Sequence, residues 1–145
     1  MEENKEHAHQ IEITDLEIMA TDGSSADDIF NRAITLKKAG QTDEAVKYLE
    51  QSLSMNPDNI ECLYNLGIVY RDMENYPKAL EIFQRANKVQ PKNSKILYAL
   101  AKTYEQSDIK EAIRCYEQCL QSEDNAVLVE VAKERLKAIK KWRKH

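Results

Sequence analysis

The sequence is poor in glycine and histidine, and both shortages argue against an enzyme. Its 145 residues include only three glycines, which stand too far apart to build the glycine-rich loop that holds a phosphate group. The three histidines fall at positions 7, 9 and 145, in the two terminal tails. No G-x-S-x-G or H-E-x-x-H motif occurs, and the cysteines form no paired C-x-x-C motif. We therefore expect no catalytic residue, no cofactor and no small-molecule substrate.

Cysteine is also scarce, and its pattern bears on compartment and metal binding. Three cysteines are an odd number without the spacing of a disulfide framework, which favours a reducing compartment. Cys115 and Cys119 lie one helical turn apart with no histidine nearby, so we interpret them as small buried residues. His7 and His9 stand on an acidic tail and are weak grounds for a metal site. We predict that the chain has none.

Long hydrophobic runs are missing as well. No run approaches the roughly 18 apolar residues that a membrane-spanning helix needs. The N-terminal sequence MEENKEHAHQ is acidic and lacks the basic start and apolar stretch of a secretory signal. Together with the cysteine pattern, these features predict a cytoplasmic protein without a transmembrane segment.

The charges are unevenly distributed along the chain. Residues 1–28 hold nine acidic residues against one lysine, whereas residues 133–145 hold seven basic residues against one glutamate. The whole chain carries a formal net charge of −4, so the middle is close to neutral. Blocks of like charge at the termini usually mark solvated tails and sometimes interaction tails.

The stretch Ile60–Asn93 shows what kind of fold to expect. Its apolar residues first follow the i, i+3, i+4, i+7 spacing of a helix, with Gly67 on the buried stripe. A polar break follows, in which Asn75 is a suitable N-cap and Pro77 fits the first turn of a second helix. Glycine costs about 1 kcal/mol inside a helix relative to alanine. We therefore predict that another backbone approaches Gly67 closely.

The same pattern recurs with a period of 34 residues, counted between Pro57 and Pro91. When the pattern of Ile60–Asn93 is moved by about 34 residues toward either terminus, it matches two more helical hairpins. In the third, the second stripe arrives one residue early, so we expect a shortened loop at Gln106–Asp108. Such a period is the signature of stacked helix–turn–helix repeats.

These residues resemble the tetratricopeptide repeat (TPR) family. The second unit follows the family pattern at most of its characteristic positions: Leu63, Leu66, Gly67, Tyr70, Ala79, Phe83, Ala86 and Pro91. The other units depart from it, for example with Ala33 and Ala101 at the glycine position, Ser52 at the late alanine and Asp124 at the proline. The resemblance implies an all-α fold, an α-α superhelix (TPR solenoid) of three hairpins with a C-terminal capping helix.

The expected organisation has three parts. Residues 1–24 form an acidic, mostly flexible N-terminal segment. Residues 25–124 form three repeats, with boundaries at 26–59, 60–93 and 94–124. Residues 125–145 form a basic amphipathic capping helix that Asn125 opens. We expect its inner face to contain Leu128, Val131, Ala132, Arg135, Ile139 and Trp142.

The resemblance also indicates where a partner would bind, because in this family certain positions of each first helix point into a concave groove. Carried onto this chain, these positions give ten partner-binding residues: Phe30, Asn31, Ile34, Tyr64, Asn65, Ile68, Arg71, Lys95, Tyr98 and Lys102. The three aromatic residues would form a ladder across the groove. The asparagine amides could grip a peptide backbone. Aromatic packing between repeats, without any partner, would explain the same rings.

One subtype of the family holds the terminal carboxylate of a chaperone with five polar groups. The corresponding positions here are Phe30, Ile34, Asn65, Lys95 and Ala99, of which only Asn65 and Lys95 match. Loss of three polar groups would leave a buried carboxylate poorly compensated. We do not expect a chaperone C-terminal carboxylate as the ligand.

We therefore predict a protein–protein interaction module, an adaptor or scaffold that binds a partner peptide or helix in the groove. Two alternatives stay open. In the first, the chain self-associates as a homo-oligomer, with the acidic and apolar segment 11–19 occupying its own or a neighbour's groove. In the second, the basic C-terminal helix binds an anionic surface or nucleic acid.

Overall fold

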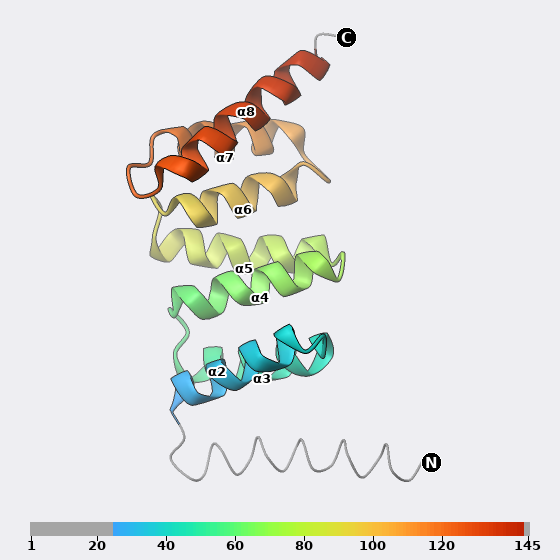
Figure 1. Cartoon of the computed structure of the whole chain (residues 1–145), viewed down its shortest axis with the longest axis vertical. Coiled ribbons are helices and arrows are strands. Elements are labelled where there is room, and N and C mark those ends of the chain that lie inside the picture. Colours follow the sequence, from blue (N-terminus) through green and yellow to red (C-terminus); the bar gives the residue numbers. More distant parts are fainter. Residues whose placement is uncertain (1–24, 144–145) are drawn as a thin grey trace. The chain divides into compact units, whose positions relative to one another are not determined.

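The computed structural model describes residues 25–143, and these residues are all α-helical apart from the connecting loops (Figure 1). The segment 11–19 and the three histidines lie outside the described residues. The chain divides into two compact units, Met1–Pro57 and Asp58–His145. The seven helices of the described part are α2 (Ala26–Lys38), α3 (Thr42–Met55), α4 (Ile60–Asp72), α5 (Tyr76–Val89), α6 (Ser94–Tyr104), α7 (Ile109–Leu120) and α8 (Ala126–Arg143).

In the first unit, α2 and α3 pack against each other as a helical hairpin. A capping box starts α2, since the Ser25 hydroxyl accepts from the Asp28 N–H and the Asp28 carboxylate accepts from the Ser25 N–H. Gly40 follows the helix with a φ of 80°, the left-handed conformation that ends many helices. Ser52, at the position where the family carries alanine, is fully buried and donates its hydroxyl hydrogen bond to the Ala26 carbonyl at 2.8 Å. The Ser52 hydroxyl, which alanine would lack, therefore has a hydrogen-bond partner in the core.

In the second unit, α4 and α5 form the next hairpin, and the Asn75 side chain caps α5 as expected. The prediction for Gly67 is wrong in one respect. A Cβ atom at this position would lie 2.4 Å from Cε1 of Phe83, so an aromatic side chain rather than a backbone approaches the glycine. Phe83 is completely buried, and the missing side chain at Gly67 makes room for its ring.

In the third hairpin, formed by α6 and α7, the prediction of a shortened loop is wrong. Four residues separate these helices, Glu105–Asp108, whereas three separate α4 from α5. The deleted residue is taken from the helix, because α6 has 11 residues where α4 has 13. Asp108 then caps α7 by accepting from the Glu111 N–H. Sequence spacing alone cannot tell a shorter helix from a shorter loop.

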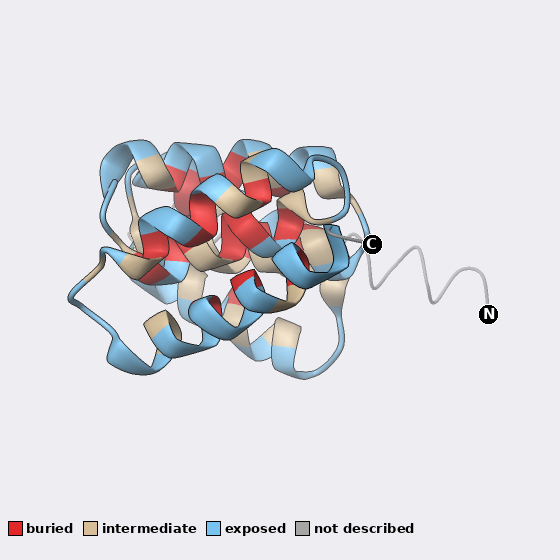
Figure 2. Cartoon of the chain, turned by 90° about the horizontal axis from the view of Figure 1, so that it is seen from above, coloured by how far each residue is buried: buried red, intermediate tan, exposed pale blue. Residues whose placement is uncertain are grey.

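Helix α8 packs on α7 and α6, and the Asn125 side chain caps it by accepting from the Leu128 N–H at 3.0 Å. Its inner face differs from the predicted one. Ala132, Leu136 and Ile139 are buried, while Val131 is 43% and Trp142 80% exposed. The helix is therefore rotated about its axis so that Leu136 is central to the contact. Figure 2 shows buried residues on the inward faces of the helices and exposed residues on their outer faces.

Candidate partner-binding face

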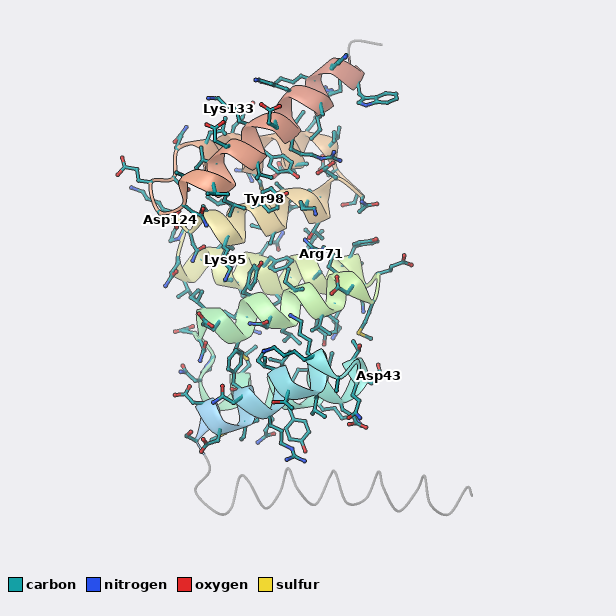
Figure 3. The ribbon with its side chains drawn as sticks, in the orientation of Figure 1. Asp43, Arg71, Lys95, Tyr98, Asp124 and Lys133 are labelled. Carbon is teal, nitrogen blue, oxygen red and sulfur yellow. The ribbon has the colours of Figure 1, made fainter. Side chains whose placement is uncertain are left out.

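Within the second unit, the first helices of two successive repeats, α4 and α6, contact each other. The seven predicted site residues on these helices keep some exposed surface, although most of their neighbours in the helix are buried. Lys95 and Lys102 are exposed, and the other five are half-buried. We call these seven residues the α4–α6 face: Tyr64, Asn65, Ile68, Arg71, Lys95, Tyr98 and Lys102. Figure 3 shows Arg71 on α4, and Lys95 and Tyr98 on α6.

Lys95 and Tyr64 form the closer of the two cation–π contacts of the face. The Nζ atom of Lys95 lies 4.5 Å from the centroid of the Tyr64 ring, within the range of a cation–π interaction. The Tyr64 ring also approaches that of Phe83, with 6.3 Å between the centroids. The ring therefore contacts both a core aromatic residue and a surface cation.

A small hollow opens beside this pair. It has a volume of about 100 Å³ and is lined by Ile60, Glu61, Tyr64, Asn93, Lys95 and Ile96. Its lining combines two aliphatic side chains, one aromatic ring, and one charge of each sign. Burial raises the pKa of the Tyr64 hydroxyl, and the nearby Arg71 guanidinium opposes the shift. Tyr64 thus stays a neutral phenol at physiological pH and can donate a hydrogen bond to a ligand.

Tyr98 repeats the arrangement on α6. The Nζ atom of Lys102 lies 5.8 Å from the Tyr98 ring centroid. The Tyr116 ring meets Tyr98 edge to face, with 5.8 Å between their centroids. Both tyrosines of the face are thus packed on a core aromatic ring and covered by a lysine.

Asn65 is less available than its position suggests. Its side-chain amide donates a hydrogen bond to the Glu61 carbonyl at 2.8 Å, one turn earlier in the same helix. One of its two N–H donors is therefore used within α4. Asn65 can offer fewer hydrogen bonds to the backbone of a partner peptide than a free amide could.

The first unit carries the remaining three predicted residues on α2. Asn31 is exposed, and Phe30 and Ile34 are half-buried. Asn31 lines a shallow hollow of about 490 Å³ together with Asp28, Arg32, Thr35 and Leu36. Neither Phe30 nor Ile34 lines that hollow.

Sequence reasoning missed a side-chain network at the end of the third repeat. The Glu105 carboxylate accepts from Arg135 Nε, at 3.0 Å to each oxygen, and from the Tyr116 hydroxyl at 2.5 Å. Burial acts to raise the pKa of Glu105, but the hydrogen bonds from Arg135 and Tyr116 hold it below its usual value. The network ties α8 to the third hairpin. Glu105 lies 11 positions from Tyr116 and 30 from Arg135, and the only sequence signal is the basic character of the last helix.

The three cysteines are free thiols and all are buried. Burial raises the pKa of Cys115 to about 11, so it stays protonated and unreactive. Within residues 25–143 no group of three or more His, Cys, Asp or Glu side chains is placed to hold a metal ion. In the same residues no helix is long and apolar enough to cross a membrane.

Comparison with known proteins identifies the family. Two family models, both described as tetratricopeptide repeat, match residues 36–103 and 94–125. The chain belongs to the tetratricopeptide repeat family, and its fold is an all-α helical repeat. This confirms the resemblance and the predicted fold class.

Curated relatives match over part of this chain. It is 34% identical over 82 residues to the general transcriptional corepressor trfA of Dictyostelium discoideum, covering 56% of this chain and 6% of that protein. It is 31% identical over 65 residues to anaphase-promoting complex subunit 3 of Schizosaccharomyces pombe, covering 45% of this chain and 10% of the relative. The chain therefore spans about a tenth or less of the length of these relatives.

Solved structures show the same fold at low sequence identity. The first TPR of Spaghetti (RPAP3), bound to the HSP90 peptide SRMEEVD, has a TM-score of 0.75 at 19% identity. That match covers 84% of this chain and 95% of the other. The Yersinia enterocolitica type III secretion chaperone SycD, in complex with a peptide of the translocator YopD, has a TM-score of 0.75 at 16% identity. It covers 81% of this chain and 93% of that chain.

Proposed function

We propose that this chain is a non-catalytic adaptor or scaffold that binds a peptide or helix of a partner protein on the α4–α6 face. Membership of a family of interaction modules supports binding rather than catalysis. Two proteins of similar fold were solved with bound peptides, which supports a peptide as the kind of ligand. The three buried thiols favour the reducing environment of the cytoplasm.

The observation that carries the proposal is the pair of lysine-covered tyrosines. Tyr64 and Tyr98 each contact a fully buried aromatic ring, Phe83 and Tyr116 respectively, so each tyrosine ring is restrained before any partner arrives. Ordering a side chain on binding costs about 0.5–1.5 kcal/mol, and a ring that is already fixed avoids most of that cost. Tyrosine and arginine are also the residues that most often dominate binding energy at protein interfaces. The face offers both.

The charges of the face indicate the chemistry of the partner. Arg71, Lys95 and Lys102 contribute three positive charges, while Glu61 beside the small hollow contributes one negative charge. We expect the bound segment to carry an apolar side chain for the hollow and carboxylates for the cations.

A chaperone C-terminal carboxylate is not the expected ligand, although one structure of similar fold holds an HSP90 peptide. At the five polar positions of that subtype, this chain has apolar residues at Phe30, Ile34 and Ala99. Ala99 is buried with 2% exposure and offers no hydrogen bond. The Asn65 amide already donates to the Glu61 carbonyl. Lys95 and the second Asn65 N–H would provide too few bonds for a desolvated carboxylate.

The residues on α2 form a separate part of the proposal. Phe30 and Ile34 are half-buried apolar side chains beside the exposed Asn31 amide. We propose that they make a second contact with the same partner. Phe30→Ala then weakens binding by a smaller factor than Tyr64→Ala does.

The test is an affinity capture from a eukaryotic lysate with three immobilised baits. The first is the wild type, and the second carries Tyr64→Ala and Lys95→Ala. The third is a matched control with Tyr76→Ala and Lys88→Ala, which removes the same two residue types from α5. All three baits are first compared by circular dichroism and thermal unfolding. Proteins that bind the wild type and the control but not the second bait support the proposal, and equal retention on all three contradicts it.

A further inference from the structure

A second concave surface lies where α8 passes the connection between α6 and α7. It is a pocket of about 320 Å³, at the lower end of the roughly 300–1,000 Å³ typical of ligand sites. Its lining shares no residue with the α4–α6 face and consists of Glu105, Ile109, Arg135, Ala138, Ile139, Trp142 and Arg143.

The walls of this α8 pocket combine four apolar side chains with three charged ones. Trp142 is 80% exposed and Ile109 37% exposed, and both border the pocket. A single exposed apolar residue is common on protein surfaces. Two large exposed apolar residues beside one hollow indicate a surface that binds another apolar group. Removing apolar area from water is favourable, so an inserted aliphatic side chain would be stabilised here.

The electrostatics of the pocket favour a negatively charged occupant. Its only acidic lining residue, Glu105, is already bonded to Arg135 and Tyr116. Three lysines of α8 also pair with carboxylates: Lys133 with Glu130, Lys137 with Glu134, and Lys140 with Glu117. For Lys141 and Arg143 the described residues provide no ion-pair partner. These two cations flank Trp142 in the sequence.

The chain itself contains a segment of complementary chemistry. Residues 11–19 read IEITDLEIM and combine five large apolar residues with three carboxylates and no basic residue. Over residues 1–24 the net charge is −6, whereas residues 133–143 carry +5. We propose that the α8 pocket is a docking site for the segment Ile11–Met19 of this protein, with an aliphatic side chain in the pocket and carboxylates near Lys141 and Arg143.

The single tryptophan of the sequence makes this docking directly measurable. Trp142 lines the pocket, and residues 1–24 contain no aromatic residue that would contribute to the emission. Acrylamide quenching of Trp142 is compared between the full-length wild type and a full-length variant with Ile13→Ser, Leu16→Ser and Ile18→Ser. A matched control carries His7→Ser and His9→Ser, outside the docking segment. None of these changes touches a described residue.

Docking should lower the wild-type quenching constant to about half that of the serine variant, because an occupant covers one of the two faces of the indole ring. The histidine control should match the wild type. A synthetic peptide of residues 1–24, added to the serine variant, should restore the protection and shift the emission to the blue. The same peptide with the three serines should not. Because the peptide is added separately, the result holds whether the segment docks on its own chain or on a second copy.

Ionic strength gives an independent check. Raising the salt concentration from 0.1 to 1 M shortens the Debye length from about 10 to about 3 Å, which should bring wild-type quenching close to that of the variant. Equal quenching of wild type and serine variant at low salt, with no response to the peptide, overturns the proposal. If vesicles with anionic phospholipid protect Trp142 and the peptide does not, the pocket serves a membrane surface instead and the proposal is likewise overturned.

Discussion

The ammonium group of Lys95 lies 4.5 Å from the centre of the Tyr64 ring, which joins two successive repeats across one face of the second unit. A cation over an aromatic ring near the protein surface is worth about 0.5–1 kcal/mol, too little to explain the stability of the unit. The contact matters because it restricts where the two side chains lie. The lysine and the ring fix each other at the edge of a hollow that a partner side chain can enter.

The first prediction concerns Glu105, which links the third hairpin to α8. Replacing it by Gln keeps the size of the side chain but removes the charge that Arg135 and Tyr116 bond. Hydrogen bonds to a charged group contribute about 1.5–3 kcal/mol, and the partly exposed Arg135 reduces that value. Glu105→Gln should therefore lower the free energy of unfolding by about 1–2 kcal/mol at pH 7. The urea midpoint measures this loss.

The pH dependence of this effect has a definite sign. The pKa of Glu105 is lower in the folded protein than its ordinary value of 4.5, so its contribution is complete above pH 4.5 and is lost as the pH falls through the folded pKa. The difference between wild type and Glu105→Gln should shrink toward zero over that acidic range. A difference that stays constant between pH 7 and pH 3 would contradict the role of the charge.

The second prediction concerns Gly67 and Phe83. Gly67→Ala gains about 1 kcal/mol of helix propensity, yet its Cβ would lie 2.4 Å from a ring atom in the core. Overpacking of this kind costs about 1–3 kcal/mol, so the variant should be less stable than the wild type. In a Phe83→Leu background the clash is absent, and the same substitution should be neutral or stabilising. Thermal unfolding of the four proteins tests this coupling, and a stabilising Gly67→Ala in the wild type would refute it.

The third prediction concerns Asp124, which replaces the proline common in the family. Its carboxylate accepts from the Ser94 N–H at 3.2 Å, at the first residue of α6. Hydrogen bonding from the Ser94 side chain, and then from the Ser94 backbone, holds the pKa of Asp124 below its usual value. A lost helix-capping acceptor costs about 0.5–2 kcal/mol, and the exposure of Asp124 favours the lower end. Asp124→Ala should show that loss in urea unfolding at pH 7. Asp124→Asn keeps an acceptor oxygen and should lose less, and equal losses for both would show that the bond is unimportant.

The sequence predicts local features of this fold well. The sequence predicts the capping side chains Ser25, Asn75 and Asn125, because a cap depends on residues within one turn. Gly40 ended its helix for the same local reason. The period of 34 residues was sufficient to identify the family.

Features that depend on tertiary packing could not be derived from spacing. The inner face of α8 was predicted with Trp142 and without Leu136, because a helix with apolar residues on several sides does not reveal how far it rotates on its neighbour. The contact of Lys95 with Tyr64 joins different repeats and depends on rotamers. The Glu105 network also depends on tertiary packing. Arg135 can be identified as a partner of Glu105 only when the position of α8 is known.

The proposal that the α4–α6 face binds a partner protein is tested most directly by titrating a captured partner against the purified wild type and two variants. Truncating an interface tyrosine at a binding hot spot costs about 2 kcal/mol, so Tyr64→Ala should raise the dissociation constant on the order of 30-fold. Tyr76→Ala, the matched change on α5, should leave it within about twofold, or roughly 0.4 kcal/mol. If Tyr64→Ala binds as tightly as the wild type, the partner does not contact this face, and the proposed binding site is wrong.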